Sequence, residues 1–323
     1  MLSRIAESLY WMSRYLERVD STARLIEINL IAMLEAEIRL SEAAEWRPLL
    51  AISGQEEAYR KINGEEITAK RAIDFLARET RHSGSVRSSL RLARENARVV
   101  RDRISRDMWE CVNELWLKSD ALLRAPLAAE KAAAFCRTLR SEVARFHGLT
   151  VSIMMRGEAF GFYLLGFFLE RADMTTRILE VKYHLLLPDL SMVGSALDYY
   201  QWAGLLRSLS AFEPFRRKYH TGLRPLDVGE FMILEPDFPR SLRFAVDRMR
   251  QALGEIGGVG PGARSAGALA AVEALLAETS AEKIFAQGLY EFLEEFVASV
   301  CGLHDAIADD YFEAHLGEVS CAT

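Results

Sequence analysis

Charged side chains recur at helical spacing in two separate segments of the sequence. Each segment carries glutamate, aspartate, arginine and glutamate at positions i, i+3, i+7 and i+10; the residues are Glu17, Asp20, Arg24 and Glu27, then Glu170, Asp173, Arg177 and Glu180. This spacing places the four side chains in one row along a helix, with the aspartate and the arginine at pairing distance. Such rows predict either internal ion pairs or a polar cleft that clamps a carboxylate, an amino acid or a peptide.

The helices that must position the two rows repeat each other in sequence. Residues 15–28 and 168–181 are identical at seven of fourteen positions. In the first copy the row borders a stripe of apolar residues, which are Leu9, Met12, Leu16, Val19, Ala23, Ile26 and Leu30. Because a charged row at the edge of a buried face is partly removed from water, its members need partners within the protein.

Further matches follow in the same order along the chain. Residues 153 to 156 positions apart agree, and the pairs include Trp46 with Trp202, Phe75 with Phe231, Ser85 with Ser241, and Gly148 with Gly302. A repeat of this length predicts an internal duplication. We expect two similar helical-bundle halves, residues 1–150 and 151–323, related by a pseudo-twofold axis, either as separate halves or within one compact unit.

The periodicity of apolar residues indicates an all-α fold. Helical spacing extends over residues 2–40, 68–79, 84–124, 130–187, 192–213, 238–254 and 281–316, and no segment indicates a strand. The glycine-rich segment 254–267 predicts a flexible loop.

Arginines line one face of a predicted helix in the first half. They stand at i, i+4, i+7, i+11 and i+14, and the residues are Arg87, Arg91, Arg94, Arg98 and Arg101. Five guanidinium groups on one face repel one another unless anionic groups meet them. The alternatives are solvent, an acidic partner, the phosphates of a nucleotide or RNA, or an acidic helix of the same chain with Glu291, Glu294, Glu295, Asp305 and Asp309.

Composition excludes several classes of protein. A net charge of -6 over 323 residues argues against a wholly basic nucleic-acid binder. The four cysteines are too widely spaced for a disulfide framework or a thiolate zinc site. Charged residues near the N-terminus argue against a signal peptide, and the apolar run 159–169 is too short to span a membrane. We expect a soluble, cytoplasmic protein without membrane contact.

Metal-ligand and nucleophile motifs are weak. Glu79 with His82, and Cys301 with His304, have the spacing of two ligands on one helix, but neither pair is repeated or completed by further ligands. Phosphate-binding loops and nucleophile elbows are missing from the sequence. We therefore predict no metal site and no cofactor, and the sequence identifies no catalytic residue.

The chain resembles the bacterial alpha-E family, which is all-helical and named for an E-R motif. The resemblance covers nearly the whole chain and rests on "SLYWMSRYLERVDSTARLIE" at 8–27, "ENARVVRDRIS" at 95–105, "LGFFLERADMTTRILEVKYHLLL" at 165–187 and "FPRSLRFAV" at 238–246. The two copies differ in the flank of the motif, with Ser13 and Arg14 in the first and Gly166 and Phe167 in the second.

The resemblance implies an association with circularly permuted ATP-grasp proteins and transglutaminase-like peptidases, and hence with a system that makes and trims amide or peptide bonds. The positions that match the family motif are Glu17, Arg18, Asp20, Arg24, Glu170, Arg171, Asp173 and Arg177. The leading hypothesis is an accessory or co-catalytic subunit that binds an ATP-grasp ligase-like partner or its anionic or peptidic substrate. Two alternatives stay open: an acyl- or aminoacyl-transfer enzyme with Glu17 or Glu170 as base, and an RNA-binding helper that uses the arginine face.

Overall fold

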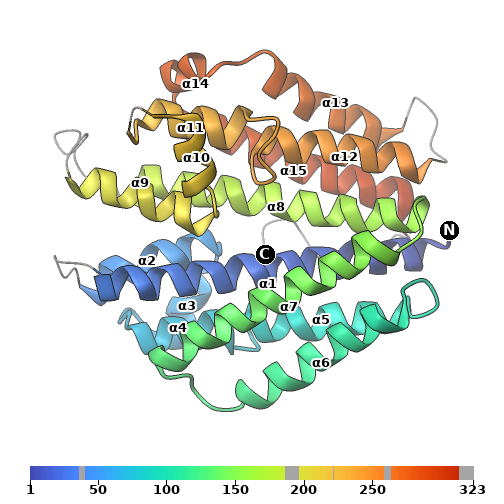
Figure 1. Ribbon diagram of the computed structural model, residues 1–323, viewed down its shortest axis with the longest axis horizontal. Helices are drawn as coiled ribbons and strands as arrows, with labels where there is room; N and C mark the ends of the chain where they lie inside the picture. The colour runs from blue at the N-terminus through green and yellow to red at the C-terminus, as the bar shows by residue number, and fades with distance from the viewer. Residues whose placement is uncertain (36–40, 186–195, 221, 258–262, 313–323) are drawn as a thin grey trace. The chain divides into compact units, whose positions relative to one another are not determined.

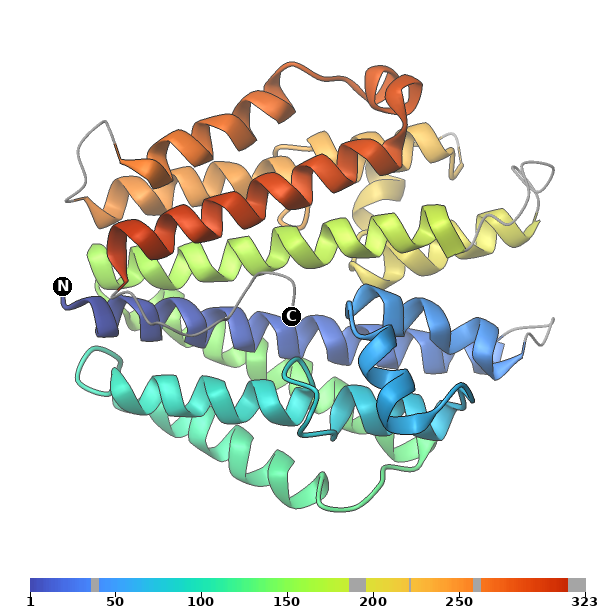
Figure 2. The same cartoon turned by 180° about the vertical axis from the view of Figure 1, so that it is seen from behind.

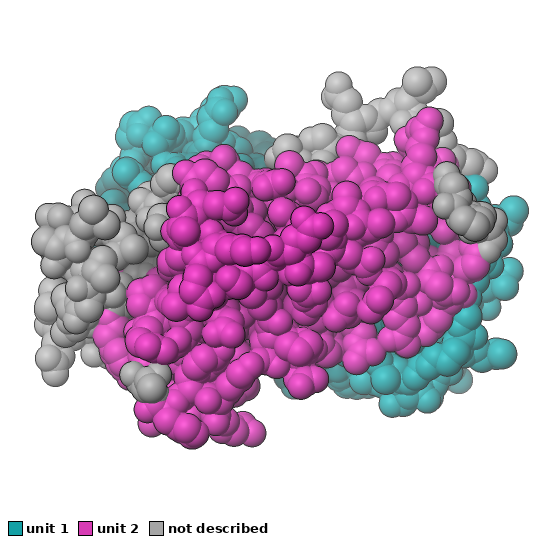
Figure 3. Space-filling view, turned by 90° about the horizontal axis from the view of Figure 1, so that it is seen from above, with its two compact units in different colours: residues 1–167, 315–323 teal, residues 168–314 magenta. Residues whose placement is uncertain are grey.

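The computed structural model describes residues 1–35, 41–185, 196–220, 222–257 and 263–312. These described residues form fifteen helices and no strands, which confirms the all-α prediction. They fall into two compact units, residues 1–167 in unit 1 and residues 168–312 in unit 2, which are coloured separately in Figure 3. The boundary lies inside a helix, and each unit is described by itself below.

Unit 1 is built around a bundle of four long helices. They are α1 (Ser3–Glu35), α5 (Val86–Val99), α6 (Arg106–Leu122) and α7 (Ala129–Ile153). Helix α1 packs against α5 and α7, and α6 packs against the same two helices (Figures 1 and 2). Three shorter helices, α2 (Glu42–Ile52), α3 (Glu56–Asn63) and α4 (Ala69–Ala77), follow α1 in the chain and pack near its C-terminal end.

Short polar residues define where the helices of unit 1 begin. Ser41, Thr68, Ser85 and Ser105 each accept a hydrogen bond from the backbone N–H three residues later, at the start of α2, α4, α5 and α6. Such N-caps satisfy one of the backbone donors that a helix start leaves without an intrahelical acceptor. The caps therefore fix the first turn of these four helices, each of which packs on α1 or α7.

Unit 2 contains most of α8 and the helices that follow it. Helix α8 (Glu158–Leu185) begins in unit 1 and continues into unit 2, where it is followed by α9 (Ala196–Ser208), α10 (Phe212–Lys218), α11 (Pro225–Leu234), α12 (Leu242–Ile256), α13 (Arg264–Ala277), α14 (Ala281–Gln287) and α15 (Leu289–Tyr311). Helix α13 packs against α12 and α15, and α11 packs against α12 and α14. The rings of Phe168 and Phe244, 5.9 Å apart, join α8 to α12.

Several predicted helices are interrupted. The stretch 84–124 is two helices, α5 and α6, because the chain turns at 100–105 and Ser105 caps a new helix. The stretch 130–187 is also two helices, separated at 154–157, where Gly157 has φ 129°. A positive φ of this kind costs little only for glycine. The predicted loop 254–267 is shorter, since α12 extends to Ile256 and α13 begins at Arg264; residues 258–262 lie outside the described part.

The apolar stripe predicted on α1 is buried along its whole length, from Leu9 to Leu30. The burial extends much further than one stripe, because Tyr10, Ser13, Arg14 and Glu17 are also buried. Helix α1 between residues 8 and 27 therefore has almost no solvated face. The sequence predicts a one-sided amphipathic helix there, and the structure corrects this to a helix enclosed on most sides.

Aromatic contacts recur in the two units at residues 156 positions apart. In each unit one phenylalanine contacts two other rings, one edge-on and one stacked. In unit 1, Phe75 contacts Tyr59 edge-on and stacks on His82. In unit 2, Phe231 contacts Phe215 edge-on and stacks on Phe238. The ring centroids are 5.3 and 4.6 Å apart in unit 1, and 5.6 and 4.8 Å apart in unit 2. The local packing of the segments after the first long helix is thus alike in both units.

A glycine allows α1 and the start of α8 to approach closely within unit 1. A Cβ atom on Gly166 would overlap the backbone oxygen of Tyr10 and the hydroxyl of Ser13. No such neighbour surrounds Gly148, which is exposed within α7.

This difference predicts opposite effects of the same substitution. Gly166→Ala should lower the free energy of unfolding by about 1–3 kcal/mol, because the backbone must shift to relieve the overlap. The control Gly148→Ala should be neutral or raise it by up to about 1 kcal/mol, since alanine favours helix. Urea unfolding followed by circular dichroism measures both, and equal effects of the two variants would contradict the close approach.

Candidate functional site

The charged row on α1 is held by α7. Asp20 pairs with Arg24 on the same helix, with Nη2 2.9 Å from Oδ2, as the spacing predicts. Arg140 of α7 donates to Glu27 and lies 3.9 Å from Asp20. Arg137, one turn earlier on α7, lies 3.7 Å from Glu27. The row in unit 1 therefore forms an ion-pair network that joins two long helices of the bundle.

Sequence reasoning missed the two α7 arginines that pair with the row. They stand three residues apart on a helix that also carries many exposed charges, and nothing in their own spacing separates them from a solvated face. Only the packing of α1 on α7 brings them to Glu27. The sequence does not show which helices are neighbours, so it could not identify these arginines as partners of a buried glutamate.

The E-R dipeptide of α1 lies at the centre of the buried region. Glu17 is 1% exposed. Arg18 is half-buried; its guanidinium lies 5.8 Å from the ring centre of Tyr15, and its stem packs near Gly84. Gly84 directly precedes Ser85, the N-cap of α5. The arginine of the dipeptide thus contacts the segment that starts the second long helix of unit 1.

The matching dipeptide of α8 makes an equivalent contact within unit 2. Glu170 is fully buried, and Nη1 of Arg171 donates to the backbone oxygen of Pro239 at 3.4 Å. Four residues further along α8, the hydroxyl of Thr175 donates to the oxygen of Arg240 at 3.2 Å. The two acceptors are the two residues before Ser241, the N-cap of α12. The second dipeptide therefore also holds the start of the long helix that follows.

The remainder of the second row differs from the first in charge. Asp173 and Arg177 form the predicted pair, with Nε 3.0 Å from each carboxylate oxygen. The residues 154 positions after Arg137 and Arg140 are Glu291 and Glu294. Tyr290 donates to Glu294, and this hydrogen bond, with burial and the negative charges of Glu294, Glu180 and Glu291, raises the pKa of Tyr290 to about 12. The two helical positions that are arginines in unit 1 are thus glutamates in unit 2.

The arginine face of α5 is paired mainly with its own bundle. Arg87 donates to Asp120 of α6 at 2.8 Å, and Arg94 donates to Asn113 at 2.8 Å and to Glu95 at 2.9 Å. Arg98 pairs with Glu95, while Arg101 lies over the ring of Trp109 at 5.1 Å. Within the described residues Arg91 is exposed and has no ion pair.

The partners differ from those that the sequence suggests. The predicted acidic residues of α15 belong to unit 2, whereas the carboxylates that meet Arg87 and Arg98 come from α6 and from α5 itself. Nearby residues on consecutive antiparallel helices reach each other more readily than distant ones. The arginine face therefore joins α5 to α6, and its members Arg91, Arg98 and Arg101 lie at the surface.

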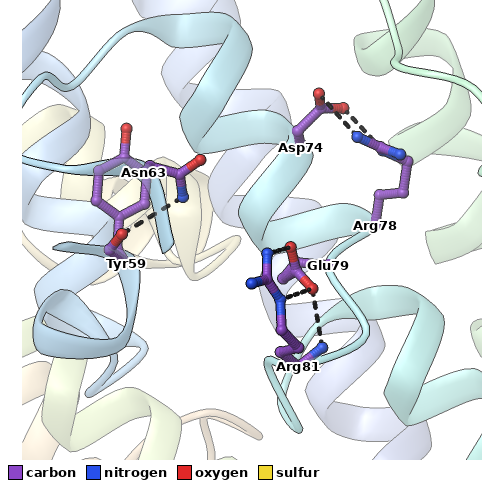
Figure 4. A network of polar contacts seen from close by, with 6 residues as sticks. All are labelled: Tyr59, Asn63, Asp74, Arg78, Glu79 and Arg81. Atoms are coloured by element: carbon purple, nitrogen blue, oxygen red, sulfur yellow. Dashed lines mark hydrogen bonds and ion pairs between the residues drawn. The ribbon is translucent and has the colours of Figure 1, made fainter. Parts of the chain in front are cut away.

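The weak metal motif of Glu79 and His82 is used in another way. Figure 4 shows the end of α4, where Arg81 holds Glu79 through its guanidinium and its backbone N–H, and Arg78 holds Asp74. Donation from Arg81 lowers the pKa of Glu79 to about 2. His82 stacks on Phe75 instead of turning toward Glu79 as a second ligand. Among the described residues no three His, Cys, Asp or Glu side chains gather as a metal site would require.

The comparison with known families decides the classification. Residues 1–312 match the family Alpha-E, described as "a predicted alpha-helical domain with a conserved ER motif". The chain belongs to the Alpha-E family. No curated protein and no solved structure matches it. Among the described residues, no helix has the length and apolar content required to cross a membrane.

The family description gives weight to the two E-R dipeptides. This Alpha-E chain contains the dipeptide at two places only, Glu17–Arg18 and Glu170–Arg171. Both glutamates are buried, and both arginines contact the segment before an N-capped long helix. The geometry of the dipeptides thus directly supports a structural role for them. In this chain each dipeptide contacts the segment before the helix that starts about 70 residues later.

His82 is a buried titratable group next to the first dipeptide. It is 2% exposed, and its Nδ1 has no hydrogen-bond partner among the described residues. Burial is the main cause that lowers the pKa of His82 to about 4; the positive charge of Arg18 lowers it further, and Glu79 acts in the opposite direction. The imidazole is therefore neutral at pH 7.

The α1–α7 network predicts unequal effects of removing its two arginines. Arg140→Met should lower the free energy of unfolding by about 2–3 kcal/mol, because it leaves Glu27 buried without its nearest cation. Arg137→Met, which removes a mostly exposed side chain at 3.7 Å, should cost less than about 1 kcal/mol. Chemical denaturation of both variants checks this, and equal costs would argue against a buried network centred on Arg140.

His82 predicts a loss of stability in acid. Its pKa is about 4 in the folded protein and near 6.5 in the unfolded chain, so between these values the unfolded chain binds the additional proton. Stability should therefore fall as pH drops from about 6.5 to 4, by up to about 3 kcal/mol from this group. His82→Phe should flatten the profile of unfolding free energy against pH in that window. An unchanged slope in the variant would show that His82 is not buried in the neutral form.

Proposed function

We propose that this Alpha-E protein is an accessory or co-catalytic subunit of an ATP-grasp-linked system that forms amide or peptide bonds. The observation that carries the proposal is the structural use of the motif helices. Glu27 of α1 is paired with Arg140 of α7, and Arg171 of α8 donates to the backbone before α12, so both contacts hold helices together as in a scaffold. The association of the alpha-E family with ATP-grasp proteins and transglutaminase-like peptidases names the system that such a scaffold would serve.

We also infer that the scaffold is one helical module used twice, with the two halves related by a pseudo-twofold axis. The support comes from each unit separately. The aromatic contacts recur 156 residues apart, the aspartate–arginine pairs recur 153 residues apart, and Ser85 and Ser241 cap the corresponding long helices. In this proposal the repeated dipeptides hold equivalent places in the two copies.

The charged surface of unit 1 is the part of the scaffold that we assign to the partner. Arg91 and Arg101 are exposed and make no ion pair with the described residues, whereas Arg106, also exposed, pairs with Glu110. Guanidinium groups of this kind suit a carboxylate or phosphate on an acidic partner or on its substrate. This surface gives the ligase-like protein or its anionic substrate a place to bind.

The two alternatives receive less support. A general base must reach the proton that it abstracts, and both Glu17 and Glu170 are buried, so the transfer enzyme requires these side chains to become accessible. The RNA-binding alternative has fewer arginines to use, because Arg87 and Arg94 already contact α6. Neither alternative has an observation of its own that favours it over the scaffold.

Copurification with the ATP-grasp ligase-like protein, together with ligase turnover in the presence and absence of this chain, tests the proposal. We expect a complex and a higher turnover when both are present. Arg91→Glu with Arg101→Glu should weaken the complex by about tenfold or more, since complementary charges guide association. Each single variant, Arg91→Glu or Arg101→Glu, should weaken the complex more than the control Arg106→Glu, which makes the same change of charge beside the arginine face. Unchanged turnover and no complex would contradict the proposal.

A further inference from the structure

The short helices α3 and α10 pack in the same way in their own units. Tyr59 of α3 and Phe215 of α10 each contact a phenylalanine edge-on, with an interplanar angle of 83° in both cases. The next two residues in each helix are basic; they are Arg60 and Lys61 in α3, then Arg216 and Arg217 in α10. Each unit therefore places a pair of cations at the same point of the same local packing.

Unit 1 neutralises its pair of cations from within the chain. Arg60 lies 2.8 Å from a carboxylate oxygen of Glu56 and 3.5 Å from one of Glu65. Lys61 lies 2.7 Å from an oxygen of Glu57. Both cations of α3 thus have carboxylate partners within five residues of them in the sequence.

Unit 2 lacks most of these carboxylates. Three glutamates of unit 1 have uncharged counterparts 156 positions later, since Glu56, Glu65 and Glu66 correspond to Phe212, Thr221 and Gly222. The counterpart of Glu57 is Glu213, which is exposed and makes no ion pair with the described residues. Arg216 and Arg217 are exposed as well, and neither makes an ion pair within the described part of the chain.

A further arginine lies at the same place in unit 2. Arg207, in the last turn of α9, has Ala51 as its counterpart in unit 1. Its guanidinium lies 5.1 Å from the ring centre of Phe212, and the guanidinium of Arg216 lies 5.8 Å from the same ring. Helix α9 packs against α10 (Figure 1). Two like charges beside one ring repel each other, and an anion that meets both relieves this repulsion.

The net charge of the two segments differs accordingly. Residues 47–66 contain three basic and four acidic residues, whereas residues 203–222 contain four basic residues and one acidic residue. The net charge is therefore -1 in unit 1 and +3 in unit 2, with histidine counted as neutral. One of the four cations, Lys218, contacts the carboxylate of Glu235. The other three are exposed arginines, and a local excess of cations attracts an anionic partner.

We propose that the basic patch of unit 2, formed by Arg207, Arg216 and Arg217, is a docking surface for an acidic peptide segment of a partner. A guanidinium binds a carboxylate through two parallel, charge-assisted hydrogen bonds. The patch is distinct from the surface of Arg91 and Arg101 in unit 1. The inference does not depend on the proposed subunit role.

Unit 1 indicates that carboxylates are the chemistry that suits these cations. The groups that meet Arg60 and Lys61 there are all glutamate side chains. They come from two places in the sequence, before and after the cations, so a single carboxylate does not replace them. A segment with several neighbouring glutamates or aspartates supplies from another molecule what unit 1 supplies from its own chain.

A fluorescein-labelled peptide of six glutamates, titrated with the full chain at pH 7 and low salt, tests the patch by fluorescence anisotropy. We expect saturable binding with Kd on the order of 100 µM. Added salt should weaken it, because exposed charges are screened. A peptide of six glutamines should not bind. A titration without saturation would overturn the proposal, as would equal binding of the two peptides.

Charge reversal on α10 is the decisive change. Arg216→Glu with Arg217→Glu should weaken binding of the glutamate peptide by about tenfold or more, since like charges then face each other. The matched control, Arg60→Glu with Lys61→Glu, makes the same change on α3 and should leave Kd within about twofold. Circular dichroism checks that both variants fold. Equal losses of affinity in the two double variants would overturn the proposal.

Phe212→Glu tests the comparison of the two units without removing a cation. It places a carboxylate four residues before Arg216, as Glu56 stands before Arg60, where opposite charges pair on a helix. This carboxylate should compete with the peptide and weaken its binding by about threefold or more. Phe212→Gln, which removes the ring without adding charge, should weaken binding less. Equal effects of these two substitutions would contradict the proposal.

Two further measurements distinguish other occupants and other surfaces. Arg91→Glu with Arg101→Glu, the variant that tests the subunit role, should leave peptide binding within about twofold. Loss of binding in that variant would assign the peptide to α5 and overturn the proposal. An RNA of six nucleotides that binds more tightly than the glutamate peptide, and loses affinity on reversal of Arg216 and Arg217, would identify a nucleic acid as the occupant and overturn it too.

Discussion

The constraint on which the structure depends is the burial of ionised groups along α1. Between residues 8 and 27 this helix has almost no solvated face, yet it carries Glu17, Asp20, Arg24 and Glu27. Charges removed from water are tolerated only with partners close by. Arg24 supplies one partner from the next turn, and Arg140 of α7 supplies another. The position of α7 against α1 is therefore set by charge as well as by apolar contact.

The same constraint explains what the E-R dipeptides do in each unit. The arginine that follows each buried glutamate reaches the segment before an N-capped helix, at Gly84 in unit 1 and at Pro239 in unit 2. A motif that links helices distant in sequence restricts how the bundle can assemble. Buried polar groups can fix one arrangement at some cost in stability, and we propose that role for the dipeptides here.

Features that depend on residues close together in the sequence could be predicted from it. Helical periodicity identified the long helices, and the i, i+4 spacing identified the pairs Asp20–Arg24 and Asp173–Arg177. The breaks at 100–105 and 154–157 could not be predicted from periodicity, because an apolar stripe can continue through a turn that a cap such as Ser105 creates. The predicted pseudo-twofold arrangement of the two halves stays a prediction.

Contacts between distant helices required the structure. The sequence offered the acidic residues of α15 as partners of the arginine face, whereas Asp120 and Asn113 of α6 take that role for Arg87 and Arg94. Arg137 and Arg140 were missed for the same reason, since charge on a helix does not reveal which helix lies opposite. His82 was noticed only as a possible metal ligand, and its isolation beside Arg18 follows from the packing of Phe75 and Gly84.

A double-mutant cycle between Glu27 and Arg140 tests most directly whether the buried charges are architecture. The unchanged protein, Glu27→Gln, Arg140→Met and the double variant are unfolded in urea, and the coupling free energy is taken from the four values. Our account predicts a favourable coupling of about 1.5 kcal/mol or more, because a largely desolvated pair depends on both of its members. A coupling below about 0.3 kcal/mol would contradict it and would show that the row on α1 does not hold α7 in place.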